Sequence, residues 1–225
     1  MIVCADDFGL NASVNSAILQ LCRKKSIDAV SVLINNLSGA EAEDLKAHHV
    51  DIKIGLHVDL FSWRIFDIDA QCESQIQKFI QVFGFFPDFV DGHMHCQIYP
   101  SFSKALIKTV LKYPHQEGFF IRSTELAPEV FLSAKNWVDL VYLHWVNRLG
   151  KSFKNKLLSH NLQTNEFCWG VFKSHADIRD VFELARHYSK SSDVLFVHPG
   201  VTNVDSVNRV AEFKLFDSLK ESGKL

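Results

Sequence analysis

The chain has 225 residues, of which 47% are hydrophobic and 22% are charged, and its formal net charge is −2. This length suits one domain with one buried core, and α/β barrels often reach this size as a single unit. A charge so near zero gives no reason to expect nucleic acid or an anionic membrane as a partner.

Buried strands and amphipathic helices alternate through the first half of the chain. The apolar run from Met1 to Cys4 predicts a buried strand. The apolar spacing from Val14 to Cys22 predicts a helix with Asn11 or Ser13 as its cap. Further on, we expect strands at 30–34, 52–60 and 89–91, a helix at 38–47 opened by a capping box, and a helix around 76–83 stopped by Gly84.

The second half continues the same rhythm. Helices are expected at 102–113, 129–153, 174–189 and 207–219, and strand-like segments at 119–122 and 194–197. This alternation favours a parallel sheet with helices outside it. No domain boundary is visible, so we expect a single domain over residues 1–225. Periodicity alone does not separate a closed barrel from an open sheet.

The cysteines and the apolar runs indicate the compartment. Five cysteines are scattered without a CxxC pair, which argues against a disulfide framework and against a thiolate zinc site. No apolar run reaches the ~18 residues of a membrane span, and we expect no secretory leader ahead of the first strand. The expected location is therefore the cytoplasm, with no membrane partner.

Carboxylates and imidazoles follow several of the expected strands. Asp6 and Asp7 come directly after the first one, and two adjacent carboxylates repel each other unless a cation or another partner compensates them. The other polar segments are Gly55-Leu56-His57, Asp91-Gly92-His93-Met94-His95 and His198-Pro199-Gly200. In a barrel, the strand exits form the catalytic face. We therefore expect these groups to meet around a metal ion.

Two of the candidate imidazoles are two residues apart, and on a strand His93 and His95 would share a face. Two His and one carboxylate around a divalent metal leave coordination positions open, as in catalytic sites. Such a metal lowers the pKa of water and polarises a carbonyl, while a free carboxylate takes a proton and a further His protonates a leaving amine. Five residues could supply these parts of an amide hydrolase: Asp6, Asp7, His57, His93 and His198.

These motifs resemble those of the YdjC-like carbohydrate deacetylases, a family that includes chitooligosaccharide deacetylase and a hopanoid-biosynthesis deacetylase. The matching strings span nearly the whole chain in the family's order: Ala5 to Leu10, Gly55 to His57, Gly84 to Pro87, Asp91 to His95, Arg122, and His198 to Gly200 with Arg209 and Glu212. The resemblance implies a single-domain α/β fold, a distorted TIM-like (β/α) barrel. It also implies removal of an N-acetyl group from an amino-sugar-containing oligosaccharide or glycoside.

The resemblance implies roles for particular residues. One divalent metal ion, magnesium or zinc, would be bound by Asp7, His57 and His93. Asp6 would be the base that activates water, and His198 the acid for the leaving amine. Asp91, His95 and Arg122 would support these groups or face the substrate. The implied partner is a small N-acetylated sugar, and the family analogy leans to a homodimer.

Some features depart from the family pattern. Segment 61–72 is short where the family has a long insertion that helps to cover the substrate, Gln97 stands where a third His is usual, and the chain is expected to end early, at Leu225. These departures keep a second interpretation open, a catalytically inactive carbohydrate-binding relic. A third interpretation is a non-haem iron oxygenase, in which the second Asp and the late His would have no role.

Overall fold

Seven parallel strands form one curled sheet in the computed structural model, which describes residues 1–60, 67–171, 178–202 and 207–219. The strands are β1 (Ile2–Phe8), β2 (Ala29–Val32), β3 (Lys53–Val58), β4 (Phe89–Gly92), β5 (Phe120–Ile121), β6 (Cys168–Trp169) and β7 (Val194–Val197). Their spatial order is β5-β4-β3-β2-β1-β7-β6.

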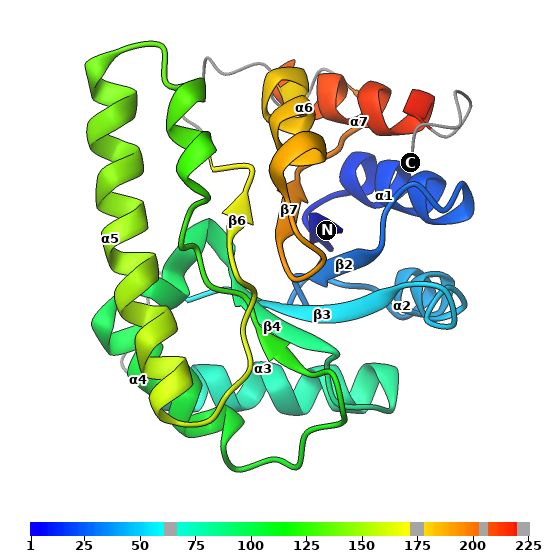
Figure 1. Cartoon of the computed structure of the whole chain (residues 1–225). Helices are drawn as coiled ribbons and strands as arrows, with labels where there is room; N and C mark the ends of the chain where they lie inside the picture. The colour runs from blue at the N-terminus through cyan, green and yellow to red at the C-terminus, as the bar shows by residue number, and fades with distance from the viewer. Residues whose placement is uncertain (61–66, 172–177, 203–206, 220–225) are drawn as a thin grey trace.

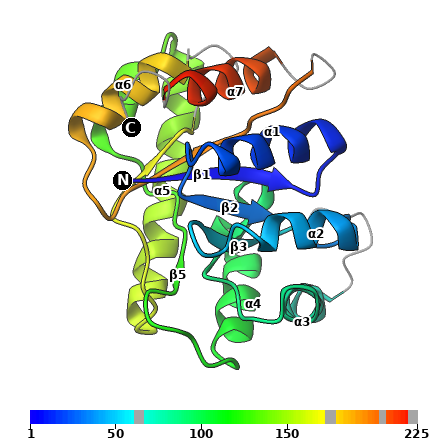
Figure 2. The ribbon, with the colours of Figure 1, turned by 90° about the vertical axis from the view of Figure 1, so that its right-hand side faces the viewer.

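The helices surround this sheet, as Figures 1 and 2 show from two sides. They are α1 (Ala12–Arg23), α2 (Gly39–Lys46), α3 (Ile68–Phe83), α4 (Pro100–Val110), α5 (Trp137–Ser159), α6 (Ile178–Tyr188) and α7 (Val207–Leu219), with the 3-10 turns η1 (His93–Ile98) and η2 (Pro128–Ser133). In Figure 1, α4 and α5 lie on one side of the strands and α1 and α2 on the other.

The two edges of the sheet approach each other. Leu126, in the segment that follows β5, forms a parallel bridge with Cys168 of β6. Beside it, the Cys168 N–H donates to the Glu125 carbonyl over 2.7 Å. These contacts form a seam between the chain after β5 and β6, so the parallel sheet curls back on itself. The α/β fold with a distorted TIM-like barrel is therefore confirmed.

Local sequence signals account for several element ends. The Asn11 side chain accepts a hydrogen bond from the Val14 N–H over 3.0 Å and caps α1. The expected capping box between Ser38 and Glu41 is present at the start of α2. Gly84 ends α3 in the left-handed region at φ 82°. The helix expected at 207–219 is also observed as α7.

Other boundaries differ from the expectations. β1 runs on to Phe8, so the two adjacent carboxylates lie inside the strand instead of after it. The long helix expected at 129–153 divides into η2 and α5, and β6 was not expected at all. The start of the helix expected at 174–189 lies outside the described residues, as does segment 61–66 of the short cover region.

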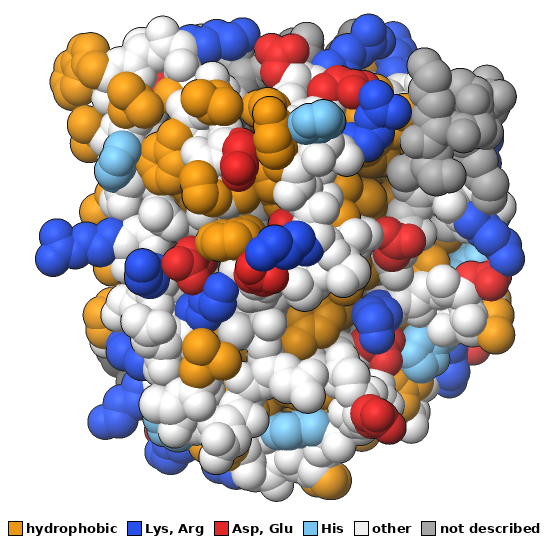
Figure 3. All heavy atoms as spheres, in the orientation of Figure 1, with side chains coloured by type: hydrophobic (Ala, Val, Ile, Leu, Met, Phe, Trp, Pro, Cys, Tyr) orange, Lys and Arg blue, Asp and Glu red, His pale blue; other side chains and the backbone are white. Residues whose placement is uncertain are grey.

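Apolar side chains are unevenly placed on α5. In the space-filling view they gather at the upper left, over η2 and the first turns of α5 (Figure 3). Exposed members include Leu132, Trp137 and Val141. Farther along α5, Phe153 and Leu157 are buried in the core. Leu143 and Val146 of its first half are buried as well, so one face of α5 packs on the barrel along most of its length. None of the described helices combines the length and the apolar character that crossing a bilayer requires.

A glycine lets α5 approach the chain after β5. A Cβ atom at Gly150 would lie 2.4 Å from the carbonyl carbon of Thr124 and 2.7 Å from the Glu125 nitrogen. These neighbours are backbone atoms next to the seam, which cannot move aside as a flexible side chain can. Gly150 therefore sets the distance between α5 and the barrel.

We expect Gly150→Ala to lower the free energy of unfolding by about 1–3 kcal/mol, because overpacking at this contact outweighs the gain in helix propensity. Urea denaturation measures the change. Gly39→Ala is the matched control, since a Cβ there meets nothing within 4 Å, and this variant should be unchanged or slightly more stable. Equal or greater stability in Gly150→Ala would contradict the close approach.

Candidate metal centre

The end of β1 turns two consecutive carboxylates toward one site. On a regular strand, neighbouring side chains point to opposite faces. Here the register of β1 against β2 shifts between Ala5 and Phe8, and Asp7 has a positive φ of 73°. A bulge of this kind re-aims a side chain. As a result, Asp7 contacts His57 and Asp6 contacts Arg122, two groups that Asp91 links by contacting both.

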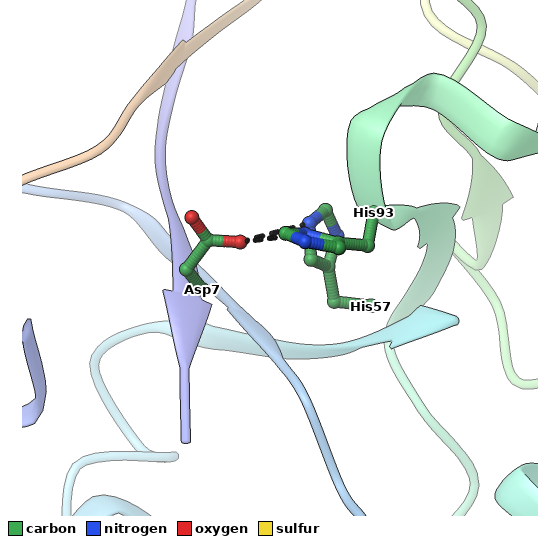
Figure 4. Close-up of side chains that lie close together, drawn as sticks. All are labelled: Asp7, His57 and His93. Atoms are coloured by element: carbon green, nitrogen blue, oxygen red, sulfur yellow. Dashed lines mark hydrogen bonds and ion pairs between the residues drawn. The ribbon is translucent and has the colours of Figure 1, made fainter. Parts of the chain in front are cut away.

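Asp7 meets two imidazoles from different parts of the chain. Its Oδ1 lies 3.4 Å from His57 Nε2 and 2.9 Å from His93 Nδ1. Figure 4 shows the three side chains pointing toward one another from β1, β3 and η1. The two rings stand edge to face, with centroids 5.3 Å apart. Three of the predicted metal ligands are therefore brought together.

The donor set fits a divalent cation. His57 Nδ1 donates to Asp91 Oδ1 over 2.5 Å, so whenever the ring is neutral the lone pair of Nε2 points at the Asp7 carboxylate. An acceptor facing an acceptor is unfavourable, and a cation between them would relieve it. A carboxylate that holds the far nitrogen of a ligating His is also a common arrangement at metal sites. Asp7, His57 and His93 are thus the residues that could hold a metal.

His57 would otherwise hold a second proton. Burial acts to lower its pKa, but the charges of Asp91 and Asp6 and the hydrogen bonds that the ring donates to Asp7 and Asp91 raise that pKa to about 10. A cation bound at Nε2 must displace this proton. Metal binding at this site is therefore expected to release a proton and to weaken as the pH falls.

Arg122, Asp6 and Asp91 form a second cluster, in which the guanidinium supplies the positive charge. The Arg122 guanidinium donates to both oxygens of Asp6, over 2.8 and 2.5 Å, and lies 2.9 Å from Asp91 Oδ2. All three side chains are at most 2% exposed. Burial acts to raise the pKa of Asp6, but the Arg122 charge and neighbouring His side chains lower it on balance. Asp6 is therefore held as a carboxylate.

The late His motif is tied to the last helix. The backbone N–H of His198 donates to the Glu212 carboxylate of α7. The Arg122 guanidinium that binds Asp6 lies over the Phe196 ring, 5.0 Å from its centroid. His198 packs edge to face on the Phe196 ring at 5.6 Å. The predicted acid is thus near the predicted base.

The expectation that His93 and His95 share a strand face is wrong. They lie in η1, where Met94 and His95 take left-handed φ values of 51° and 58°. The turn sends His93 to Asp7, whereas His95 packs edge to face on Phe196 at 5.2 Å. Burial and the Arg122 charge lower the pKa of His95 to about 3, so its ring is neutral.

Three contacting residues had no role in the sequence interpretation. Arg209 Nη2 donates to Asp7 Oδ2 over 2.6 Å, the Ser31 hydroxyl donates to Asp91 Oδ1 over 2.6 Å, and the Glu212 carboxylate accepts from His198. Arg209 and Glu212 stand in the strings that match the YdjC-like pattern, which was a usable signal. Ser31 gave none, because one Ser within an apolar strand is equally compatible with simple packing.

We expect His93→Ala to weaken metal binding by at least about tenfold, because it removes one of three converging donors. Metal content after dialysis against a buffered zinc solution measures the loss. His187→Ala, on the exposed surface of α6, is the matched control and should retain the wild-type content. Full occupancy in His93→Ala would sink the ligand assignment.

Similar proteins agree with this architecture. A cellobiose-phosphate cleavage protein, so named provisionally, from Enterococcus faecalis matches with TM-score 0.66 and 15% identity, over 99% of this chain and 92% of its own. A truncated 3-deoxy-D-arabino-heptulosonate 7-phosphate synthase from Thermotoga maritima matches with TM-score 0.51 and 12% identity, over 100% and 85%. A polysaccharide deacetylase from Bacillus cereus gives TM-score 0.46 and 10% identity, over 99% and 87%. At these identities the first two matches show a shared fold.

The sequence itself matches a family model. The model of the YdjC-like proteins covers residues 1–69 and 64–221, which is nearly the whole chain. Both matched ranges contain residues of the cluster just described, with Asp7 and His57 in the first and His93 in the second. The chain therefore belongs to the YdjC-like protein family.

Proposed function

We propose that this chain is a metal-dependent hydrolase that removes an N-acetyl group from an amino-sugar-containing oligosaccharide or glycoside. One observation carries the proposal: Asp7, His57 and His93 converge within reach of one cation, and the ionised Asp6 directly precedes Asp7 in β1. Family membership supports the same class of chemistry.

The metal's contribution is that of a Lewis acid, which polarises a carbonyl group and lowers the pKa of water. Two imidazole ligands favour zinc by their softness, while the resemblance keeps magnesium open. Around that ion, Asp91 orients the His57 ring and fixes which nitrogen faces Asp7. Ser31 holds Asp91 in turn.

Asp6 is the proposed proton acceptor. Its lowered pKa keeps it ionised at neutral pH, and Arg122 fixes both oxygens so that the carboxylate cannot rotate away. A general base must be in its charged form when the reaction starts. His198 is the proposed proton donor to the leaving amine, since its ring packs on Phe196, over which the Arg122 guanidinium bound to Asp6 also lies.

The proposal is tested by acetate release from N-acetyl-chitobiose and a small panel of other N-acetylated sugars. Zinc-loaded, magnesium-loaded and chelator-treated protein are assayed in parallel. We expect release that depends on the metal and that returns when metal is added back to chelated protein. No release from any sugar by protein with measured metal content would instead favour the carbohydrate-binding relic, which sugar binding without turnover would identify.

A further inference from the structure

Only one of the two terminal nitrogens of the Arg209 guanidinium has a hydrogen-bond partner among the described residues. It lies on α7, and its Nη2 donates to Asp7 Oδ2 over 2.6 Å. The side chain is 16% exposed. Its other terminal nitrogen, Nη1, is buried and has no hydrogen-bond partner within the part of the chain that the structure describes. A buried donor on a cation without an acceptor is costly, so this nitrogen indicates a missing partner.

The backbone around Arg209 fixes this donor beside the candidate site. The Gly200 N–H donates to the Arg209 carbonyl over 3.1 Å, which ties the start of α7 to the His198-Pro199-Gly200 segment. Glu212, which lies in the same helix as Arg209, accepts a hydrogen bond from the backbone N–H of His198. Because Nη1 and Nη2 belong to one planar group, Nη1 lies at the edge of the cluster that Asp7 forms with His57 and His93.

The free nitrogen selects for an anionic oxygen. Arginine presents parallel N–H donors that suit carboxylates and other oxyanions, and charge-assisted bonds of this kind are the stronger ones. Asp7 uses one donor with one of its oxygens and directs the other oxygen at the two imidazoles. A small oxyanion that accepts a hydrogen bond from Nη1 would therefore leave the contact between Nη2 and Asp7 in place.

We propose that Arg209 Nη1 binds an oxygen of the acyl group, first as the oxygen that becomes negative and then in the acetate product. This inference rests on the proposed function. Water adds to the carbonyl carbon and gives a proton to Asp6, and the π electrons move onto the acyl oxygen. They return as the C–N bond breaks and the nitrogen takes a proton from His198. Arg209 only donates a hydrogen bond, and the acetic acid formed ionises to acetate.

The test compares acetate binding by wild-type protein and Arg209→Lys. A lysine retains a charge for Asp7 but lacks the planar second donor. Titration of zinc-loaded and of metal-free protein with ¹³C-labelled acetate, followed by NMR line broadening, gives the two dissociation constants without requiring turnover. We expect acetate to bind about tenfold more weakly to Arg209→Lys. Arg186→Lys on the surface of α6, where Arg186 pairs with Glu183, should match the wild type.

Other outcomes decide against the inference. Equal acetate affinity in Arg209→Lys and wild type would overturn it, as would weaker binding of inorganic phosphate with unchanged binding of acetate, since Arg209 would then serve a phosphate group. Zinc content and thermal unfolding of the variant are measured first. If Arg209→Lys does not fold, Arg209→Gln is read in its place with the same expectation. Because no turnover enters these measurements, they stand apart from the acetate-release assay.

Discussion

Asp6→Asn is expected to lower acetate release by about 10²–10⁴-fold while metal stays bound. The amide cannot accept the proton that Asp6 takes in the proposed reaction. Asp7, His57 and His93 do not need Asp6 to converge, because each contacts the others directly. Measuring kcat/KM together with the metal content of the same sample checks both halves of the expectation.

A buried Asp elsewhere separates lost chemistry from lost stability. Asp193 is 1% exposed and accepts hydrogen bonds from Phe167, Trp169 and Lys190. It stands before the start of β7, whereas His198 follows the other end of that strand. Asp193→Asn should therefore lower stability but keep kcat/KM for the protein that remains folded. Retained acetate release in folded Asp6→Asn would remove Asp6 as the base.

The elements that the sequence predicts well are those with strong local signals. α1 has an apolar period and the cap Asn11, α2 has the capping box at Ser38, and α3 ends at Gly84 as expected, although it begins at Ile68, eight residues before the expected start. β7 is a short apolar run between polar segments and was expected at its observed residues. In these cases the local preference and the final fold agree, so short-range reasoning is sufficient.

The elements that were missed depend on distant contacts. β6 has two residues, and its partners are β7 and Leu126 across the seam. The segment of η1 does not follow the alternation of side chains along a strand, because Met94 and His95 adopt left-handed conformations. Neither residue type favours that conformation, so the sequence does not indicate it. Two Asp facing one site likewise require the bulge in β1. Such features arise from tertiary contacts, so a pattern along the chain does not contain them.

The candidate site shows the same division. Residue types and their strand exits indicated Asp7, His57 and His93, and the structure brings these three together. The pairing of arginines with carboxylates was harder to foresee: Arg122 was expected to support the site, but only folding shows that it meets Asp6 and that Arg209 meets Asp7. The catalytic roles of Asp6 and His198 stay predictions.

Replacing Arg122 by methionine is expected to lower the free energy of unfolding by about 3–5 kcal/mol at neutral pH. The change leaves Asp6 and Asp91 buried without their shared cation, although the volume of the side chain is largely kept. Urea denaturation at about pH 7.5 measures the loss. Arg148→Met, at an exposed position of α5, is the control for the substitution itself and should stay close to the wild type.

Asp6 should make stability depend on pH in opposite directions in the wild type and in Arg122→Met. In the wild type the folded-state pKa of Asp6 is lowered, so its contribution to stability is present above the unfolded pKa and is lost as the pH falls through the folded one. Without Arg122, burial is largely unopposed and should raise the pKa of Asp6. The folded variant then binds protons more readily than the unfolded chain, so it gains stability as the pH falls toward the unfolded pKa.

The difference in unfolding free energy between wild type and Arg122→Met should therefore shrink between about pH 7.5 and pH 5, because protonation of Asp6 relieves the buried charge. Parallel urea titrations across this range measure that difference, with Arg148→Met giving the baseline. A difference that stays constant with pH would mean that the cost arises from packing around the lost guanidinium. It would then also mean that Arg122 is not what keeps Asp6 ionised.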